Sequence, residues 1–225
     1  MTQIKVEKPD TQIIGKKILV LTAHPDDESF LAAGTLHKNQ LAGGQNFLIC
    51  ASLGEKGNSH LDKPLSEDEL CEVRKQELQN ATQVIGVHRL KDLNYPDGGL
   101  ANHLTELKDT IAPELKELQP DLIMSFGPDG ATGHRDHITI AKVAEQLAEE
   151  FVLPLAQFCF AETLLAEMKE WLIQRRHQVH HYEDDFELTG GNIVIPIDGE
   201  VKLQALHCYS SLHSRHRFAD TLLRD

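Results

Sequence analysis

The sequence predicts an α/β protein with a doubly wound and mainly parallel sheet that has helices on both faces. Short β-branched apolar runs, of which residues 18–22 (ILVLT) are the first, are typical of buried parallel strands. These runs alternate with longer helical patterns, as they do in successive strand–helix–strand units. A chain of 225 residues is long enough to bury such a sheet as one domain.

The expected elements follow one another with short polar connections. Strands are expected at 17–23, 46–52, 88–93, 121–126, 155–160 and 192–197. Helices are expected at 28–42, 66–85, 100–118, 164–174 and 202–213. A further helix is expected to follow the 127–137 segment and to end at about 151. Ser66 with Glu69 forms a capping box, and Gly86 follows the helix that the box begins. We expect a single domain over 1–225, with a loose N-terminal lead-in at 1–15. The region from about 155 to 225 would complete the sheet and cap the site.

Composition excludes several classes of partner and site. A net charge of −13 argues against binding to nucleic acid or to an anionic membrane, because no basic patch is available to release counterions. The four cysteines are scattered without a CxxC pair, so a cysteine zinc site is not expected and a reducing compartment is. The polar N-terminus and the lack of a long apolar run predict no signal peptide and no membrane span, hence a cytoplasmic protein.

Two clusters of metal-ligating residue types follow the first and the fourth expected strands. They are HPDDE at 24–28 and HRDH at 134–137. Parallel strands of such a sheet end at one edge, where ligands bind, so we expect the clusters to meet there. His24, one of Asp26 or Asp27, and one of His134 or His137 would form a zinc site with a position left for water. The spare aspartate would then be free to act as a base.

Each cluster alone has a simpler interpretation. Acids at the start of a helix complement its dipole, and two histidines three residues apart occur by chance. Both clusters at one sheet edge in a small protein favour the metal site over these alternatives.

Five motifs together resemble a known family. They are AHPDDE at 23–28, GEKG at 54–57, Arg74, YPDG at 95–98 and GHRDH at 133–137. In this order they resemble the LmbE-like, or PIG-L, deacetylases, zinc-dependent amidases with a Rossmann-like fold that remove acetyl from N-acetylglucosamine units. The resemblance covers most of residues 16–150.

The resemblance implies roles that spacing alone leaves open. His24, Asp27 and His137 are the implied metal ligands, and Asp26 is the implied general base. The implied cofactor is Zn²⁺, with Fe²⁺ as an alternative, because the same ligands accept both ions.

Further roles follow from the same resemblance. His134 is expected to stabilise the oxyanion or to protonate the leaving amine, with Asp136 orienting it and keeping it cationic. Arg74 and Asp97 are expected to bind substrate. The alternatives are a surface helix cation for Arg74 and ordinary turn chemistry for Asp97.

The expected reaction is hydrolysis of the N-acetyl group of an N-acetylglucosamine-type conjugate to acetate and free amine, by water activated at the metal with Asp26 as base. The expected partner is a small N-acetylated amino-sugar substrate, and a homo-oligomer stays open. Two rival functions are a metal-dependent phosphohydrolase, which would need a second metal, and a non-catalytic protein of the same fold that binds a sugar or metabolite.

The C-terminal helix departs from the family pattern, which reads roughly K..AL..H.SQ. Here Tyr209 stands where the family has histidine, and Leu212 stands in place of glutamine. Either Tyr209 replaces the histidine in the site or it is a buried helix tyrosine.

Overall fold

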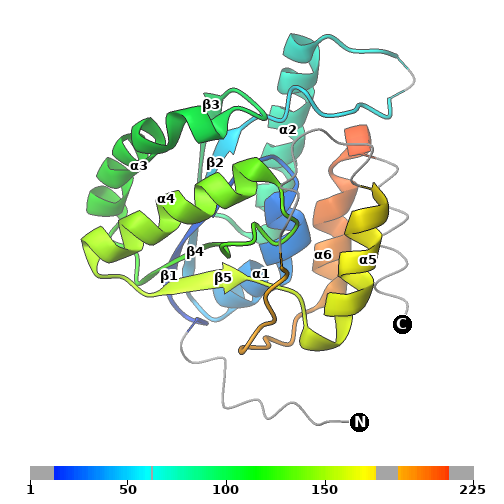
Figure 1. The fold of residues 1–225 in the computed structure, drawn as a ribbon. Helices are drawn as coiled ribbons and strands as arrows, with labels where there is room; N and C mark the ends of the chain where they lie inside the picture. The colour runs from blue at the N-terminus through cyan, green and yellow to red at the C-terminus, as the bar shows by residue number, and fades with distance from the viewer. Residues whose placement is uncertain (1–12, 62, 176–186, 213–225) are drawn as a thin grey trace.

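The computed structural model describes residues 13–61, 63–175 and 187–212. These residues form a five-stranded sheet in the order β3-β2-β1-β4-β5, and every paired strand is parallel (Figure 1). The strands are β1 (Lys17–Thr22), β2 (Gln45–Ser52), β3 (Arg89–Tyr95), β4 (Leu122–Phe126) and β5 (Leu155–Phe158). The expected fold class is confirmed.

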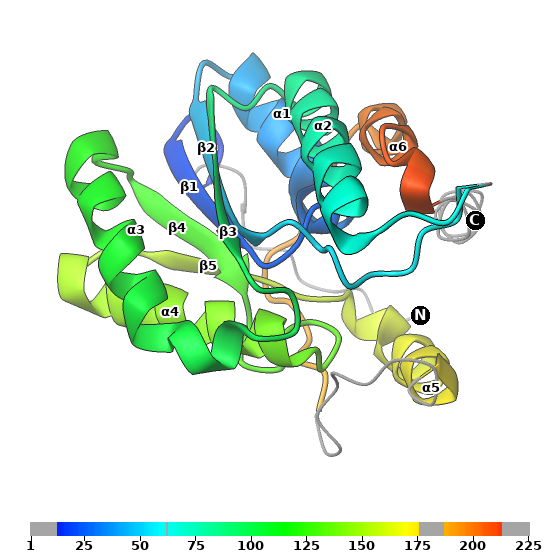
Figure 2. The same cartoon turned by 90° about the horizontal axis from the view of Figure 1, so that it is seen from above.

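Helices cover both faces of the sheet. They are α1 (Ala33–Leu41), α2 (Glu67–Ile85), α3 (Leu104–Leu118), α4 (Arg135–Phe151), α5 (Leu165–Arg175) and α6 (Gly199–His207). Figure 2 shows α1, α2 and α6 on one face and α3 with α4 on the other. A π-helical turn, Glu28–Ala32, precedes α1, and a 3-10 turn, Leu100–His103, precedes α3.

The two central strands are buried on both faces, as their unbroken apolar sequence predicts. Every residue of β4 is buried, and β1 is exposed only at Lys17. Leu19 and Val20 have no exposed surface. Truncating one such side chain to alanine costs about 2–5 kcal/mol, so these strands are a rigid base for the loops that follow them.

The capping signals of α2 are formed as expected. The Ser66 hydroxyl accepts a hydrogen bond from the Glu69 amide, and the Glu69 carboxylate accepts one from the Ser66 amide. Gly86 ends the helix with a φ of 84°, a left-handed conformation that glycine adopts without strain.

The strand order creates a switch point beside β1. From β1 the chain moves outward to β2 and β3 on one side, and then to β4 and β5 on the other. Such reversals leave a crevice at the carboxyl ends of the two central strands, where α/β proteins bind ligands. The two clusters follow β1 and β4, so both lie at this crevice.

The C-terminal region differs from the expectation. Residues 192–197 were expected as a strand, but they form none, and among the described residues nearby an isolated bridge joins Phe160 to Gly190. The reason is that β-branched composition favours an extended chain without supplying a partner strand. The Ile197 side chain instead packs against Gly34.

The expected helix at 202–213 is also shifted. α6 starts earlier, after Asp198, whose carboxylate caps the Glu200 amide. A separate 3-10 turn, Ser210–Leu212, follows the end of α6. Position 213 and most of the lead-in at 1–15 lie outside the described residues, so the single-domain assignment stays a prediction. No described helix is long and apolar enough to cross a bilayer.

Candidate active site and metal centre

Three side chains from the two clusters converge on one point. His24 Nδ1 lies 3.2 Å from His137 Nε2. The Asp27 carboxylate approaches both rings, with Oδ1 at 3.3 Å from His137 Nε2 and Oδ2 at 3.8 Å from His24 Nδ1. Ligand atoms at about 2.0–2.1 Å from a tetrahedral zinc ion are about 3.3–3.4 Å apart, so the spacings of His137 Nε2 from His24 Nδ1 and from Asp27 Oδ1 fit such an ion.

The far nitrogens of both histidines also have partners that suit a metal site. His137 Nδ1 lies 2.9 Å from the Gly130 carbonyl oxygen, to which it donates. His24 Nε2 lies 3.1 Å from Asp97 Oδ1 and 3.3 Å from Asp136 Oδ2. A histidine that donates from one nitrogen to a carboxylate or carbonyl presents the other nitrogen, unprotonated, to a metal.

The electrostatics of the site favour a cation. Burial lowers the pKa of His24, but hydrogen bonds to Asp136 and Asp97 outweigh it and raise that pKa to about 10. Burial raises the pKa of Asp27, yet the charge and hydrogen bond of His137 hold it well below its usual range. The carboxylates that stabilise a proton on His24 would stabilise a metal cation beside it.

Backbone amides distinguish Asp27 from Asp26. Asp27 Oδ2 accepts hydrogen bonds from the amides of Ala23 at 3.1 Å and His24 at 2.8 Å. Its other oxygen, Oδ1, is thereby turned toward His137. This geometry turns Asp27, the second of two adjacent aspartates, toward the point where the two histidines meet.

Asp26 is buried and has a φ of 110°, a rare conformation for a residue with a side chain. Strain of this kind costs about 1–3 kcal/mol and persists only where hydrogen bonds fix the backbone. The Asp26 amide donates to Glu28 Oε2 at 3.2 Å, and its carbonyl accepts from Ser29 and Phe30. Burial raises the pKa of Glu28 to about 7, although hydrogen bonds from Ser29 and Tyr209 lower it.

The turn after β4 holds His137 by different means. The Phe126 ring stacks on the imidazole with centroids 4.2 Å apart and planes at 16°. Gly130 has a φ of +63°, and a Cβ there would lie 2.9 Å from the His137 Cβ. Phe126 and Gly130 were not among the expected site residues, and the GPDG turn at 127–130 was the signal for the second of them.

His134 differs from its expected state. Its Nδ1 accepts a hydrogen bond from the Asp136 amide at 3.2 Å, which caps α4. An accepting Nδ1 is unprotonated, so the proton of the neutral ring is on Nε2. Burial and the neighbouring His24 and His137 lower the pKa of His134 to about 2. The structure therefore supports a neutral donor and not the expected cation.

Asp136 is also placed differently from the expectation that its carboxylate orients His134. Oδ1 accepts from the Leu100 amide at 3.1 Å, and Oδ2 accepts from the Gly98 amide at 2.7 Å. Oδ2 is the atom that lies 3.3 Å from His24 Nε2. The carboxylate contacts His24, and the backbone amide of Asp136 contacts the His134 ring, because the cap geometry turns the side chain toward the turn at 98–100.

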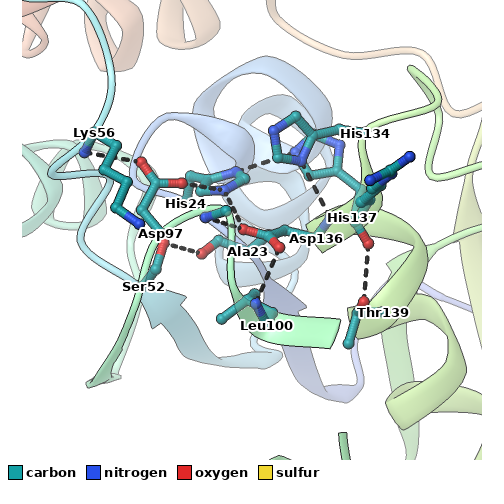
Figure 3. A network of polar contacts seen from close by, with 12 residues as sticks. Ala23, His24, Ser52, Lys56, Asp97, Leu100, His134, Asp136, His137 and Thr139 are labelled. Atoms are coloured by element: carbon teal, nitrogen blue, oxygen red, sulfur yellow. Dashed lines mark hydrogen bonds and ion pairs between the residues drawn. The ribbon is translucent and has the colours of Figure 1, made fainter. Parts of the chain in front are cut away.

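Asp97 joins two loops to the site, as Figure 3 shows. Its Oδ2 accepts from the Lys56 amide at 3.1 Å, and its own amide donates to Glu55 Oε1 at 2.8 Å. Burial raises the pKa of Asp97, but the hydrogen bond and charge of His24 hold it below its usual range. Asp97 thus does more than form a turn, since it ties the 54–57 loop to His24.

Arg74 is buried at 4% exposure and is not a surface cation. Its guanidinium lies against Gly54 and Gly57, where added Cβ atoms would come within 2.3 and 2.5 Å of it. Its Nε has no hydrogen-bond partner among the described residues. The nearby Glu77 carboxylate on the same helix accepts hydrogen bonds from the segment after α6.

In two groups of described residues all the ligand atoms lie within 4.8 Å of one another, and neither group includes Asp27. His24 and His137 also lie near His134, and His24 lies near Asp97 and Asp136. His134 is a poor third ligand since its Nδ1 holds the Asp136 amide, which leaves the proton on Nε2. The two aspartates contact the nitrogen of His24 that faces away from His137.

A family profile described as "PIG-L: GlcNAc-PI de-N-acetylase" matches residues 19–148, more than half of the chain. The chain belongs to the PIG-L family. The matched region contains both clusters, whereas Tyr209 lies outside it.

Curated PIG-L relatives carry deacetylase names. The chain is 35% identical over 136 residues to a probable N-acetyl-alpha-D-glucosaminyl L-malate deacetylase 2 from Bacillus anthracis, covering 59% of this chain and 60% of the relative. It is 31% identical over 157 residues to a 1D-myo-inositol 2-acetamido-2-deoxy-alpha-D-glucopyranoside deacetylase 2 from Catenulispora acidiphila, covering 60% and 51%. The chain therefore spans little more than half the length of these relatives.

Solved structures share the fold at lower identity. An N,N'-diacetylchitobiose deacetylase from Pyrococcus horikoshii aligns with a TM-score of 0.67 and 22% identity, covering 92% of this chain and 76% of the other. GalB from Pseudomonas putida, a 4-carboxy-2-hydroxymuconate hydratase, aligns with a TM-score of 0.56 and 16% identity, covering 92% and 84%. The fold therefore occurs with more than one activity, and function must be argued from the site.

Proposed function

We propose that this protein is a metal-dependent N-deacetylase that hydrolyses the acetamide of an N-acetylglucosamine-type conjugate to acetate and a free amine. The observation that carries the proposal is the donor set of His24, Asp27 and His137, which lies beside Asp26 and His134 at the switch point of the sheet. Membership of the PIG-L family and the names of the curated relatives support the substrate class.

His24, Asp27 and His137 would hold the metal, with zinc as the proposed ion and ferrous iron as the alternative. A metal bound there would act as a Lewis acid on the acetyl carbonyl and would lower the pKa of water from about 15.7 to about 7. Asp97 and Asp136 keep the His24 ring oriented, and the Gly130 carbonyl does the same for His137.

Asp26 is the proposed general base. It adjoins the ligand Asp27, and its own backbone is fixed in a conformation that the neighbouring hydrogen bonds determine. In the reaction it would take a proton from the attacking water and pass it to the amine nitrogen as the C–N bond breaks. General acid–base steps of this kind contribute about 10²–10⁴ in rate.

His134 is the proposed oxyanion donor. Its Nδ1 accepts the Asp136 amide, so its proton is on Nε2, which would donate to the acetyl oxygen as negative charge develops there. A donor that is already oriented stabilises the transition state without reorganising. The proposal therefore uses neutral His134 in place of the cation first expected.

Substrate would bind along the loops that Asp97 connects. The 54–57 loop and the turn at 96–98 are linked by the contacts of Asp97 with Lys56 and Glu55. We place the sugar against these loops, with Arg74 beneath them at Gly54 and Gly57. Arg74 and Asp97 remain proposed substrate-side residues, and the proposed location is the cytoplasm.

The test is acetate release from N-acetylglucosamine conjugates by the protein as purified, after chelation, and after zinc or ferrous iron is restored. The proposal expects activity that chelation abolishes and one of the two metals restores. Acetate release that persists unchanged after complete metal removal would contradict the proposed metal-dependent reaction.

The same samples test the rival functions. A metal content near two per chain, with phosphate released from phosphate esters, would favour the phosphohydrolase. Saturable sugar binding without turnover on a panel of acylated amines would favour the non-catalytic protein.

A further inference from the structure

A buried hydrogen-bond chain links the C-terminal segment to the strained residue of the first cluster. The Tyr209 hydroxyl donates to Glu28 Oε1 at 2.8 Å, across 181 residues of sequence. Glu28 Oε2 accepts from the Asp26 amide at 3.2 Å. Glu28 and Tyr209 have 0% and 1% exposure, so water does not compete for these bonds.

From this geometry we infer that Tyr209 is a positioning residue for Asp26 and acts through Glu28. The inference rests on the proposed function in one respect, since Asp26 matters for rate only if it is the general base. The contact between Tyr209 and Glu28 belongs to the structure whatever the reaction is.

The donors around Glu28 show why the tyrosine hydroxyl matters. Oε1 takes hydrogen bonds from Tyr209 and from the Ser29 hydroxyl, while Oε2 takes the Asp26 amide. A fully buried carboxylate is stable only when its oxygens are satisfied. Without the tyrosine hydroxyl, Glu28 would turn to find another donor, and its contact with the Asp26 amide would weaken.

The segment that carries Tyr209 is itself firmly attached. Glu77 on α2 accepts hydrogen bonds from the Ser210 hydroxyl, the Ser211 amide and the Ser211 hydroxyl. The Tyr209 ring packs with Ala81 and Leu212. Because these contacts do not depend on the hydroxyl, removing the hydroxyl alone should leave the segment in place.

The discriminating variant is Tyr209→Phe, with Ser210→Ala as the matched control. Ser210→Ala also deletes one hydroxyl from the same segment, but the bond lost is to Glu77 and not to Glu28. We expect Tyr209→Phe to lower kcat about tenfold or more, because misplacing a catalytic group affects the chemical step. KM and bound metal should stay at the wild-type level, and Ser210→Ala should keep kcat within about twofold.

A second readout does not depend on activity. In the metal-free protein, hydrogen exchange of the Asp26 amide, followed by NMR, should become about threefold to tenfold faster in Tyr209→Phe and remain unchanged in Ser210→Ala. Glu28→Gln should also accelerate the hydrogen exchange of the Asp26 amide. In the double variant with Tyr209→Phe the two effects should not add, because both act on one chain of bonds.

Two results would overturn the inference. One is an Asp26 amide that exchanges at the wild-type rate in Tyr209→Phe. The other is a fall in kcat matched by an equal loss of metal or by the same fall in Ser210→Ala. If the wild-type protein releases no acetate, the proposed function fails, and the exchange measurement still decides whether Tyr209 positions Asp26.

Discussion

The two turns that form the site are held in place in different ways. The turn after β4 is supported locally, because His137 donates to Gly130 seven residues earlier and stacks on Phe126 from the preceding strand. The turn after β1 depends on a distant segment, because Asp26 is fixed through Glu28 and Glu28 is bonded to Tyr209.

The residues proposed to bind the metal and the residue proposed to act as the base are therefore held in place differently. Two of the proposed ligands, Asp27 and His137, are held by nearby main-chain groups. The third, His24, is oriented by the side chains of Asp97 and Asp136. The proposed base, Asp26, has a strained backbone that a side chain from the C-terminal segment helps to fix. The family match covers residues 19–148, so Glu28 lies inside the matched region and Tyr209, at the other end of the chain of hydrogen bonds, lies outside it.

The largest expected effect distinguishes the proposed general base, Asp26, from a proposed metal ligand, His137. Asp26→Ala should lower kcat by about 10²–10⁴ while the protein keeps its metal, because a general base is lost and no ligand is. His137→Ala should lose the metal itself. Metal content by elemental analysis and initial rates of acetate release test both variants. Equal metal loss in the two variants would mean that the division of roles within HPDDE is wrong.

The second effect concerns the support of His24. Asp97→Asn should weaken metal binding about 10–100-fold, because the replaced oxygen lies 3.1 Å from His24 Nε2. Asp92→Asn is the control on β3, the strand that precedes the turn of Asp97, since Asp92 pairs with Lys75. Competition with a chelator of known affinity measures both. Unchanged metal affinity in Asp97→Asn would remove Asp97 from the support of the site.

The third effect tests local support in the second turn. Gly130→Ala should weaken metal binding about tenfold, because the new Cβ would press on the His137 Cβ and displace the carbonyl that orients the ring. It should also reduce the free energy of unfolding by about 1–2 kcal/mol. Gly43→Ala is the matched control, with a φ of +83° and nothing within 4 Å of the added Cβ. If both variants bind metal equally, the turn does not position His137.

The smallest effect on activity concerns the attachment of the C-terminal segment. Glu77→Gln should lower the free energy of unfolding by about 1–3 kcal/mol, because an amide group would face donors from Ser210 and Ser211. Activity should fall by about threefold at most, since the packing of Tyr209 remains. Urea unfolding measures the first quantity, with the exposed Glu72→Gln as control. Equal stability of the two variants would contradict this role of Glu77.

The fold followed from the sequence because its strands are buried on both faces and its caps are local. The apolar run of β1 and the capping box of Ser66 depend on residues close in sequence. The meeting of the two clusters at one edge of the sheet could be predicted, because parallel strands end at the same edge. Residues 192–197 were misassigned because a β-branched pattern does not reveal whether a partner strand exists.

The contacts between individual side chains of the site could not be predicted from the sequence in the same way. The spacing could not show that the Asp136 carboxylate faces His24, since that depends on how the 98–100 turn packs on α4. The Tyr209 contact joins residues 181 positions apart, which no local pattern encodes. The roles of His24, Asp27, His137 and Asp26 stay predictions until they are measured.

The most direct test of the metal centre is a crystal structure of the zinc-loaded protein with anomalous data collected at the zinc edge. The account predicts one peak at about 2.0–2.2 Å from His24 Nδ1, His137 Nε2 and an Asp27 oxygen, with Asp26 outside the ligand set. A zinc ion that is coordinated by His134, or one that is coordinated by Asp97, Asp136 and His24 Nε2, would contradict the proposed ligand set.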